Sequence, residues 1–258
     1  MERLSGKKTK FGLNGNALRT WGLLFLAAGI FGRGIIQTQV LGIRELNAEQ
    51  LLAVLGRTPE AMLLATASLV LQAMETCAVP VFALLLVEGA RHTTSFGKYF
   101  LRVAGLAVLC EIPYNLAISG QWFDTATRNP VFGLVLCLVM FYFYGRYPEK
   151  KAAHTLMRIL VTALSVIWSR MLGIDFGAGV VLITAAMWIF RDKPMYRNFS
   201  GAIAAAVSSA FSPFFLAAPM GLLLTHFYNE EKSTNSRAAK YLAYPAVLVA
   251  AAAIGFLI

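Results

Sequence analysis

The chain has 258 residues, of which 58% are hydrophobic and 14% are charged. A soluble domain carries about a quarter charged residues, so this composition excludes an ordinary water-soluble globular protein. The net charge of +10 comes from short basic clusters between apolar stretches. This placement is typical of loops that flank a membrane, and we expect membrane lipids as partners and no nucleic acid.

Apolar stretches follow one another from the N-terminal region to the end of the chain. They lie at 17–36, 61–89, 97–119, 130–146, 153–173, 176–190, 199–212, 214–228 and 239–258. A membrane helix needs about 20 apolar residues, so most of these stretches predict a span. The sequence predicts an all-α fold, a polytopic transmembrane helix bundle that forms a single membrane domain over residues 1–258. Residues 1–16 form a basic tail without a cleavage motif, which favours a first span over a signal peptide.

The distribution of basic residues predicts the orientation. Loops on the side of the N-terminus hold most of the Lys and Arg residues, whereas the opposite loops hold Arg44, Arg57, Arg128 and Arg170. Because basic residues accumulate in cytoplasmic loops, we expect about nine spans, with the N-terminus inside and the C-terminus outside. The expected location is the cytoplasmic membrane of a bacterium.

Two parts of the chain need a further interpretation. Pro213 and Pro219 interrupt the stretch from 199 to 228, and the charge pattern favours two short spans there over one broken helix. The longest outer connection covers residues 37–60. Its pattern at 47–55 predicts a short amphipathic helix on the outer surface.

Several ionisable residues fall within or at the ends of the predicted spans. A charged group at bilayer depth is costly, so it normally faces a partner or a polar cavity. We interpret Glu75 and Glu111 as candidate catalytic bases. The candidates for substrate binding are Arg33, Arg170, Asp175 and Asn129. The same groups are compatible with a purely structural ion-pair cluster, and both interpretations stay open at this point.

A second polar group lies at the inner end of the span predicted at 61–89. His92 is a candidate base there, although a histidine at a helix C-terminus also fits a simple cap. Basic side chains at this face can bind the phosphates of a cytosolic cofactor. The candidates for cofactor binding are Glu88, Arg91, Lys98 and Arg102. Cys77, Cys110 and Cys137 show no metal-binding spacing.

Several motifs resemble the TraX family in order and spacing over nearly the whole chain. Residues 79–92 (VPVFALLLVEGARH) are similar to the family's proline-initiated run that ends in E-G-x-x-H-T. Residues 98–102 (KYFLR) and 111–113 (EIP) resemble its K-Y-x-x-R-L and S-E-I-P segments. The likeness continues at 129–132, 175–177, 224–229 and 240–245.

The resemblance implies an inner-membrane acyltransferase that uses acetyl-CoA or another acyl-CoA. The implied acceptor is a peptide amine, as in a pilin, or a glycan hydroxyl. Many TraX proteins carry an Asp-His pair in the first span, where this chain has Gly29 and Ile30. They often have a histidine after a Tyr-Pro pair near the end, where this chain has Ala246 and Val247.

Two other function classes remain as alternatives. The missing histidines favour a non-catalytic descendant that binds a lipid, a peptide or a partner membrane protein in the same cavity. Carboxylates and interrupted helices at bilayer depth are also typical of transporters. The chain shows no inverted repeat, which makes a transporter the weaker alternative.

Overall fold

The apolar stretches form the helices of the computed structural model, which describes residues 12–43, 46–56, 58–146, 152–230 and 237–258. Within these ranges the regular structure is helical, apart from two isolated β-bridges that join Leu13 to Tyr228 and Arg128 to Ile174. The predicted all-α fold is therefore confirmed. Residues 1–11 of the predicted basic tail lie outside the described ranges.

The helices follow the predicted apolar stretches in order. In the first half they are α1 Gly15–Ile30, η1 Phe31–Val40, α2 Ala48–Leu55, α3 Pro59–Thr76, α4 Ala78–His92 and α5 Phe96–Ser119. In the second half they are α6 Val131–Tyr144, α7 Ala152–Met171, α8 Gly177–Ile189, α9 Pro194–Ser208, η2 Pro213–Ala217, α10 Ala218–His226 and α11 Arg237–Leu257. α9 and α10 are separate helices with η2 between them, and whether each crosses the membrane stays a prediction.

The connection between the first two long helices contains the predicted short helix. α2 begins with a capping box, in which the side chains of Asn47 and Gln50 each bond to the backbone of the other. The predicted boundaries at 37–60 were too wide. The first helix continues through η1 to Val40 and α3 already begins at Pro59, so the connection is shorter at both ends.

Four helical stretches among the described residues are long and apolar enough to cross a membrane. They are Gly15–Val40, Pro59–His92, Phe96–Ser119 and Ala152–Met171. Shorter apolar helices cover Val131–Tyr144, Gly177–Ile189, Pro213–His226 and Tyr241–Leu257. On α7 a row of large apolar side chains points outward and is more than half exposed, including Ile159, Leu164 and Trp168. Such a face requires an apolar surrounding, whereas the count of about nine spans and their orientation stay predictions.

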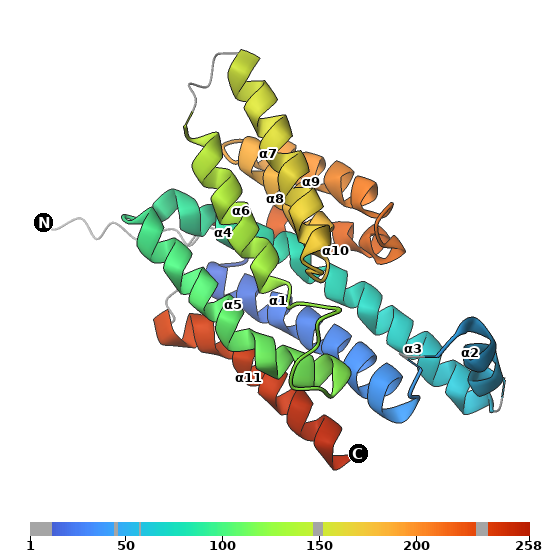
Figure 1. The fold of residues 1–258 in the computed structure, drawn as a ribbon. Coiled ribbons are helices and arrows are strands. Elements are labelled where there is room, and N and C mark those ends of the chain that lie inside the picture. The colour runs from blue at the N-terminus through green and yellow to red at the C-terminus, as the bar shows by residue number, and fades with distance from the viewer. Residues whose placement is uncertain (1–11, 44–45, 57, 147–151, 231–236) are drawn as a thin grey trace, which may run out of the picture.

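The helices pack in two groups that meet at α3 and α4 (Figure 1). α8 is surrounded by α4, α6, α7 and α9, and its buried side chains Ile183 and Met187 belong to the main apolar core. In the other group, α1 packs on α3 and α4, and α11 lies along α5 and α1. The ends of η1, α5 and α11 meet at one side of this second group, where they surround the smaller of the two cavities described below.

α3 and α4 follow each other almost without interruption. Only Cys77 separates them, and its backbone keeps helical dihedral angles. Pro80 lies in the first turn of α4, where it has no N–H to donate to the carbonyl of Thr76. The helix therefore breaks one residue after Thr76, next to Glu75, near the middle of the longest apolar stretch.

Glycines allow the first helix to approach its neighbours closely, and one of them supports a test of this packing. A Cβ atom on Gly34 would overlap the backbone carbonyl oxygen of Ala117 on α5. We expect Gly34→Ala to lower the free energy of unfolding by about 1–3 kcal/mol, because a backbone atom cannot rotate away. Thermal unfolding in detergent measures the change. Gly105→Ala is the matched control, since no atom lies within 4 Å of its Cβ position. Equal unfolding temperatures for the two variants would contradict the close contact.

Candidate functional site

A buried ionic cluster joins four distant parts of the chain. Arg33 of η1 donates two hydrogen bonds to Glu75 of α3, from Nε to Oε2 at 2.9 Å and from Nη2 to Oε1 at 2.7 Å. Arg33 Nη1 also donates to Oδ2 of Asp175, which precedes α8. The hydroxyl of Tyr114 on α5 donates to the same Asp175 oxygen. These four residues are called the ionic cluster from here on.

Local backbone features position the members of the ionic cluster. Arg33 lies in the π-helical segment η1, where Leu41 N bonds to Ile36 O at 2.9 Å in an i to i+5 pattern. Gly29 faces Glu75, and a Cβ atom at Gly29 would overlap the Glu75 side chain. The absence of a side chain at position 29 therefore leaves the space that the Glu75 carboxylate occupies.

Asp175 is held by a link between two loops. Arg128 N donates to Gly173 O at 2.8 Å, and Asp175 N donates to Arg128 O at 2.9 Å. The next residue, Phe176, has a left-handed backbone with φ of 55° and places its ring 5.0 Å from the Arg33 guanidinium carbon. The aromatic face adds a favourable cation–π contact on the side of Arg33 that no carboxylate covers.

The ionic cluster contains two carboxyl groups and one guanidinium. With both carboxylates ionised, it carries one negative charge more than Arg33 can neutralise. Among the described residues, Arg33 is the basic partner with which both Glu75 and Asp175 pair. Glu75 is 2% exposed, so the excess charge lies in a medium that solvates it poorly. One proton or one cationic ligand would complete the charge balance, and the cluster can therefore hold a proton.

A cavity of about 780 Å³ reaches from this cluster to the surface. Glu75, Phe176 and Tyr244 lie in its wall at the cluster, and apolar side chains such as Leu26 and Leu134 line its middle. Its other end lies between the start of α1 and the connection from α4 to α5. That end, called the basic mouth, is formed by Arg19, His92, Lys98 and Arg102. One cavity thus joins a positively charged surface to a buried acidic group.

Glu88 organises the helix end beside the basic mouth. Its carboxylate contacts His92 Nε2 at 3.2 Å, Arg91 Nη1 at 3.3 Å and Arg197 Nη1 at 3.9 Å. Arg91 also pairs with Asp192 at 2.9 Å, and it does not line the cavity. Of the residues predicted to bind a cofactor, Glu88, Lys98 and Arg102 line the cavity. Arg102 lies over the Tyr99 ring at 6.0 Å, and Glu88 contacts His92 and Arg91.

The prediction of one common charge cluster was wrong for two residues. Glu111 lies outside the cavity wall and binds Asn129, accepting from its Nδ2 at 2.6 Å and its backbone N at 3.2 Å. Asn129 Nδ2 also donates to Ala107 O at 2.9 Å, so this pair fastens the loop before α6 to α5. Arg170 lies over the Phe211 ring at 6.0 Å and takes no part in the ionic cluster. The position of a residue along a predicted span gives its depth in the membrane, but it does not give the face of the helix on which the side chain lies.

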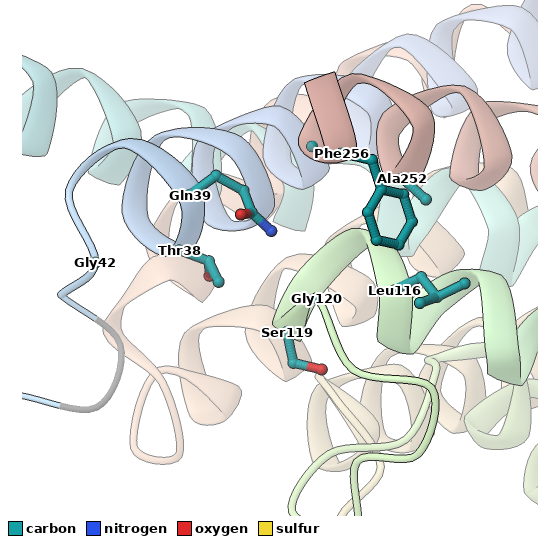
Figure 2. A pocket seen from close by; sticks show the side chains of 9 residues that line it. Thr38, Gln39, Gly42, Leu116, Ser119, Gly120, Ala252 and Phe256 are labelled. Atoms are coloured by element: carbon teal, nitrogen blue, oxygen red, sulfur yellow. The ribbon is translucent and has the colours of Figure 1, made fainter. Parts of the chain in front are cut away.

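A second cavity, of about 380 Å³, lies at the opposite end of the first helix (Figure 2). Thr38 and Gln39 of η1, Ser119 at the end of α5 and Phe256 of α11 surround it. Thr38 donates to the backbone oxygen of Arg33 at 3.0 Å, so one residue links this cavity to the ionic cluster. Gln39 is 20 residues beyond Arg19, or about 30 Å along a helix. The two cavities thus lie toward opposite ends of the first helix, and of the two the larger one is lined by a residue of the ionic cluster, Glu75.

A model of the TraX protein family matches residues 51–254. The chain belongs to the TraX family. Together with the apolar helices, this membership identifies a membrane protein. Searches of curated proteins and of solved structures returned no match. The matched range contains Glu75, Tyr114 and Asp175, but it begins after the helix that carries Arg33.

The structure also locates the positions where TraX proteins are expected to carry Asp-His. Gly29 packs against the Glu75 side chain, and Ile30 is 1% exposed in the apolar core. The carboxylate of Glu75 therefore occupies the space beside the position where the resemblance places the aspartate. The imidazole has no such replacement, because Ile30 is apolar and enclosed.

Reasoning from charge missed three members of the site. Tyr114 and Phe176 contact Arg33 or Asp175, and Tyr244 lines the cavity near them. A hydroxyl or a ring on an apolar helix costs less to bury than a charge does, so it gives a weaker sequence signal. The residues next to them in the sequence were more conspicuous. Tyr114 follows Pro113 and Tyr244 precedes Pro245, two prolines within apolar stretches, and Phe176 follows the charged Asp175.

Proposed function

We propose that this TraX-family chain is a membrane acyltransferase that moves an acyl group from an acyl-CoA, such as acetyl-CoA, to a peptide amine or a glycan hydroxyl. One observation carries the proposal: a single cavity connects the basic mouth to the buried acidic cluster. In the predicted orientation the mouth opens toward the cytoplasm of a bacterium, where acyl-CoA is available.

The basic mouth suits the phosphates of coenzyme A. Lys98 and Arg102 are exposed cations at the surface end of the cavity, and Arg19 lies in the wall between them and the apolar middle. Cationic side chains bind phosphate through charge-assisted hydrogen bonds. The neutral and apolar wall beyond them suits the pantetheine arm, which would carry the thioester toward Glu75.

The ionic cluster suits the proton transfer that acylation requires. The acceptor amine or hydroxyl attacks the thioester carbonyl carbon and gives its proton to the Glu75–Asp175 pair, which has room for one. The carbon–sulfur bond then breaks, and the coenzyme A sulfur leaves as a thiolate that takes up this proton. The products are an amide or ester and free coenzyme A. The second cavity, near Thr38 and Gln39, offers a route for an acceptor from the outer side.

Labelled acetyl-CoA and a panel of amine and hydroxyl acceptors test the activity in proteoliposomes. We expect transfer of the label, and slow thioester hydrolysis when no acceptor is present. Absence of both reactions in correctly folded protein would contradict the proposal.

The basic mouth permits a sharper test with two donors. Acetyl-pantetheine has the same thioester as acetyl-CoA but lacks the nucleotide phosphates. We expect the double variant Lys98→Gln, Arg102→Gln to raise the KM for acetyl-CoA about thirtyfold and to leave that for acetyl-pantetheine unchanged, because each of the two lost phosphate contacts is worth about 1 kcal/mol. Lys193→Gln is the control, since Lys193 is exposed and stacks on Tyr196 away from the cavity. A loss of affinity for both donors would contradict a phosphate-binding role.

A non-catalytic binding protein is the second candidate function. It is favoured by the bidentate contact of Arg33 with both Glu75 oxygens, and by the residues at the two expected histidine positions, Ile30 and Ala246. In that case the purified protein would bind acyl-CoA or an anionic lipid without turnover.

A further inference from the structure

We propose that the Tyr244 hydroxyl is the hydrogen-bond donor for the acyl carbonyl oxygen at the deep end of the large cavity. The inference rests on the proposed function and adds a catalytic residue to it. Tyr244 of α11 is 7% exposed, and its oxygen is enclosed. Within the described part of the chain this hydroxyl has no hydrogen-bond partner, although Tyr244 lines the cavity.

An unpartnered buried hydroxyl is uncommon, because burial removes its bonds to water and the protein normally replaces them. Two other buried tyrosines of this chain follow that rule. Tyr114 donates to Asp175, and the Tyr144 hydroxyl bonds to Thr162. Tyr244 differs from both because it lines a cavity, and its enclosed hydroxyl has no partner among the described residues. The remaining partner for the Tyr244 hydroxyl is an oxygen atom of a ligand in this cavity.

The surroundings of Tyr244 decide which kind of ligand atom fits. The hydroxyl lies within electrostatic range of Glu75 and Arg33, at the same end of the cavity as the ionic cluster. The ionic cluster already provides two carboxylates as acceptors, so the complementary role for the Tyr244 hydroxyl is to donate a hydrogen bond. The basic mouth holds the other end of the donor substrate, which brings the thioester to this depth.

A donor at this point has a defined chemical effect. When the acceptor attacks the carbonyl carbon, negative charge develops on the carbonyl oxygen and its hydrogen bond strengthens. Tyr244 keeps its proton throughout. The proton of the acceptor goes to the ionic cluster, and the electron pair of the carbon–sulfur bond leaves with the coenzyme A sulfur.

The variant Tyr244→Phe removes only the hydroxyl. We expect kcat for acetyl transfer to fall about 10²–10³-fold, as for loss of one donor to a developing oxyanion. The KM for acetyl-CoA should change less than threefold, because the bond strengthens only in the transition state. The unfolding temperature should not fall, since the hydroxyl has no bond within the protein to lose. Tyr142→Phe is the matched control, because Tyr142 is 51% exposed on α6 and does not line the cavity. Its kcat should stay at the wild-type value.

A pair of unreactive ligands separates this inference from the proposed function. Acetonyl-CoA carries a ketone, and 2-methylallyl-CoA has the same planar shape with a CH₂ group in place of the oxygen. We expect the wild type to bind the ketone about two- to threefold more tightly, and Tyr244→Phe to bind both equally.

The possible outcomes distinguish the two ideas. Wild-type protein that neither transfers acetyl groups nor binds either analogue would overturn the proposed function and the role of Tyr244 with it. Active wild-type protein with an unchanged kcat in Tyr244→Phe, or with no preference for the ketone, would overturn the role of Tyr244 alone. If the protein binds acyl-CoA without turnover, the two analogues still test the role of Tyr244. A preference for the ketone that is lost in Tyr244→Phe would then support the hydrogen bond from Tyr244 to the carbonyl oxygen.

Discussion

Replacing Arg33 with leucine is expected to destabilise the protein more than any other single change to the site. The variant leaves Glu75 and Asp175 without their cation, and Glu75 is almost completely buried. Removing one member of a buried ion pair costs about 3–5 kcal/mol, because the remaining charge is neither solvated nor paired. Thermal unfolding of the purified protein in detergent, and the yield of monodisperse protein, measure the loss.

Two controls identify the cause of that destabilisation. The triple variant Arg33→Leu, Glu75→Gln, Asp175→Asn has no charge left in the cluster and should recover most of the stability. Arg170→Leu removes an arginine that lies over Phe211 and pairs with neither carboxylate of the cluster, so it should cost less than about 1 kcal/mol. An unfolding temperature for Arg33→Leu equal to that of the wild type would show that the ion pairs do not hold the helices together.

Glu75→Gln is expected to have the largest effect on acyl transfer, and to destabilise the protein less than Arg33→Leu does, because one of the two acceptors for Arg33 remains. Glutamine keeps the size of the side chain and one oxygen for Arg33. The remaining Arg33–Asp175 pair is neutral, so the cluster loses its capacity for a proton. Loss of a general base lowers kcat by about 10²–10⁴-fold. Steady-state kinetics with labelled acetyl-CoA, at matched amounts of folded protein, measure the change.

Glu111→Gln and His92→Gln are the informative comparisons for Glu75→Gln. Glu111 binds Asn129 outside the cavity wall, so its replacement should change kcat less than threefold, as expected for a group remote from the reaction. His92 lies in the basic mouth and is oriented by Glu88 at 3.2 Å, which is the geometry of a base and its orienting carboxylate. Turnover that survives in Glu75→Gln and disappears in His92→Gln would assign the proton transfer to the mouth.

Several parts of the site could be predicted because burying a charge is costly wherever the chain places it. Arg33, Glu75 and Asp175 each interrupt or border an apolar stretch, and the structure brings them into contact. The same criterion selected Glu111 and Arg170, whose partners lie elsewhere. Glu111 and Tyr114 are three residues apart on α5, yet only Tyr114 reaches the ionic cluster. The depth of a residue along a span is readable from its position, whereas the direction of its side chain depends on how the helices pack.

The sequence by itself determined the all-helical membrane class, the order of the helices and the membership in the TraX family. These properties depend on local composition and motif spacing, which no long-range contact alters. The tertiary structure alone decided that Arg33 meets Glu75 and Asp175 across 42 and 142 residues of chain. It also decided that one cavity joins the basic mouth to that cluster. Tyr244 lines this cavity, and its hydroxyl has no hydrogen-bond partner among the described residues. Contacts between distant helices follow from side-chain packing and close glycine contacts, such as Gly29 against Glu75, and no local pattern encodes them.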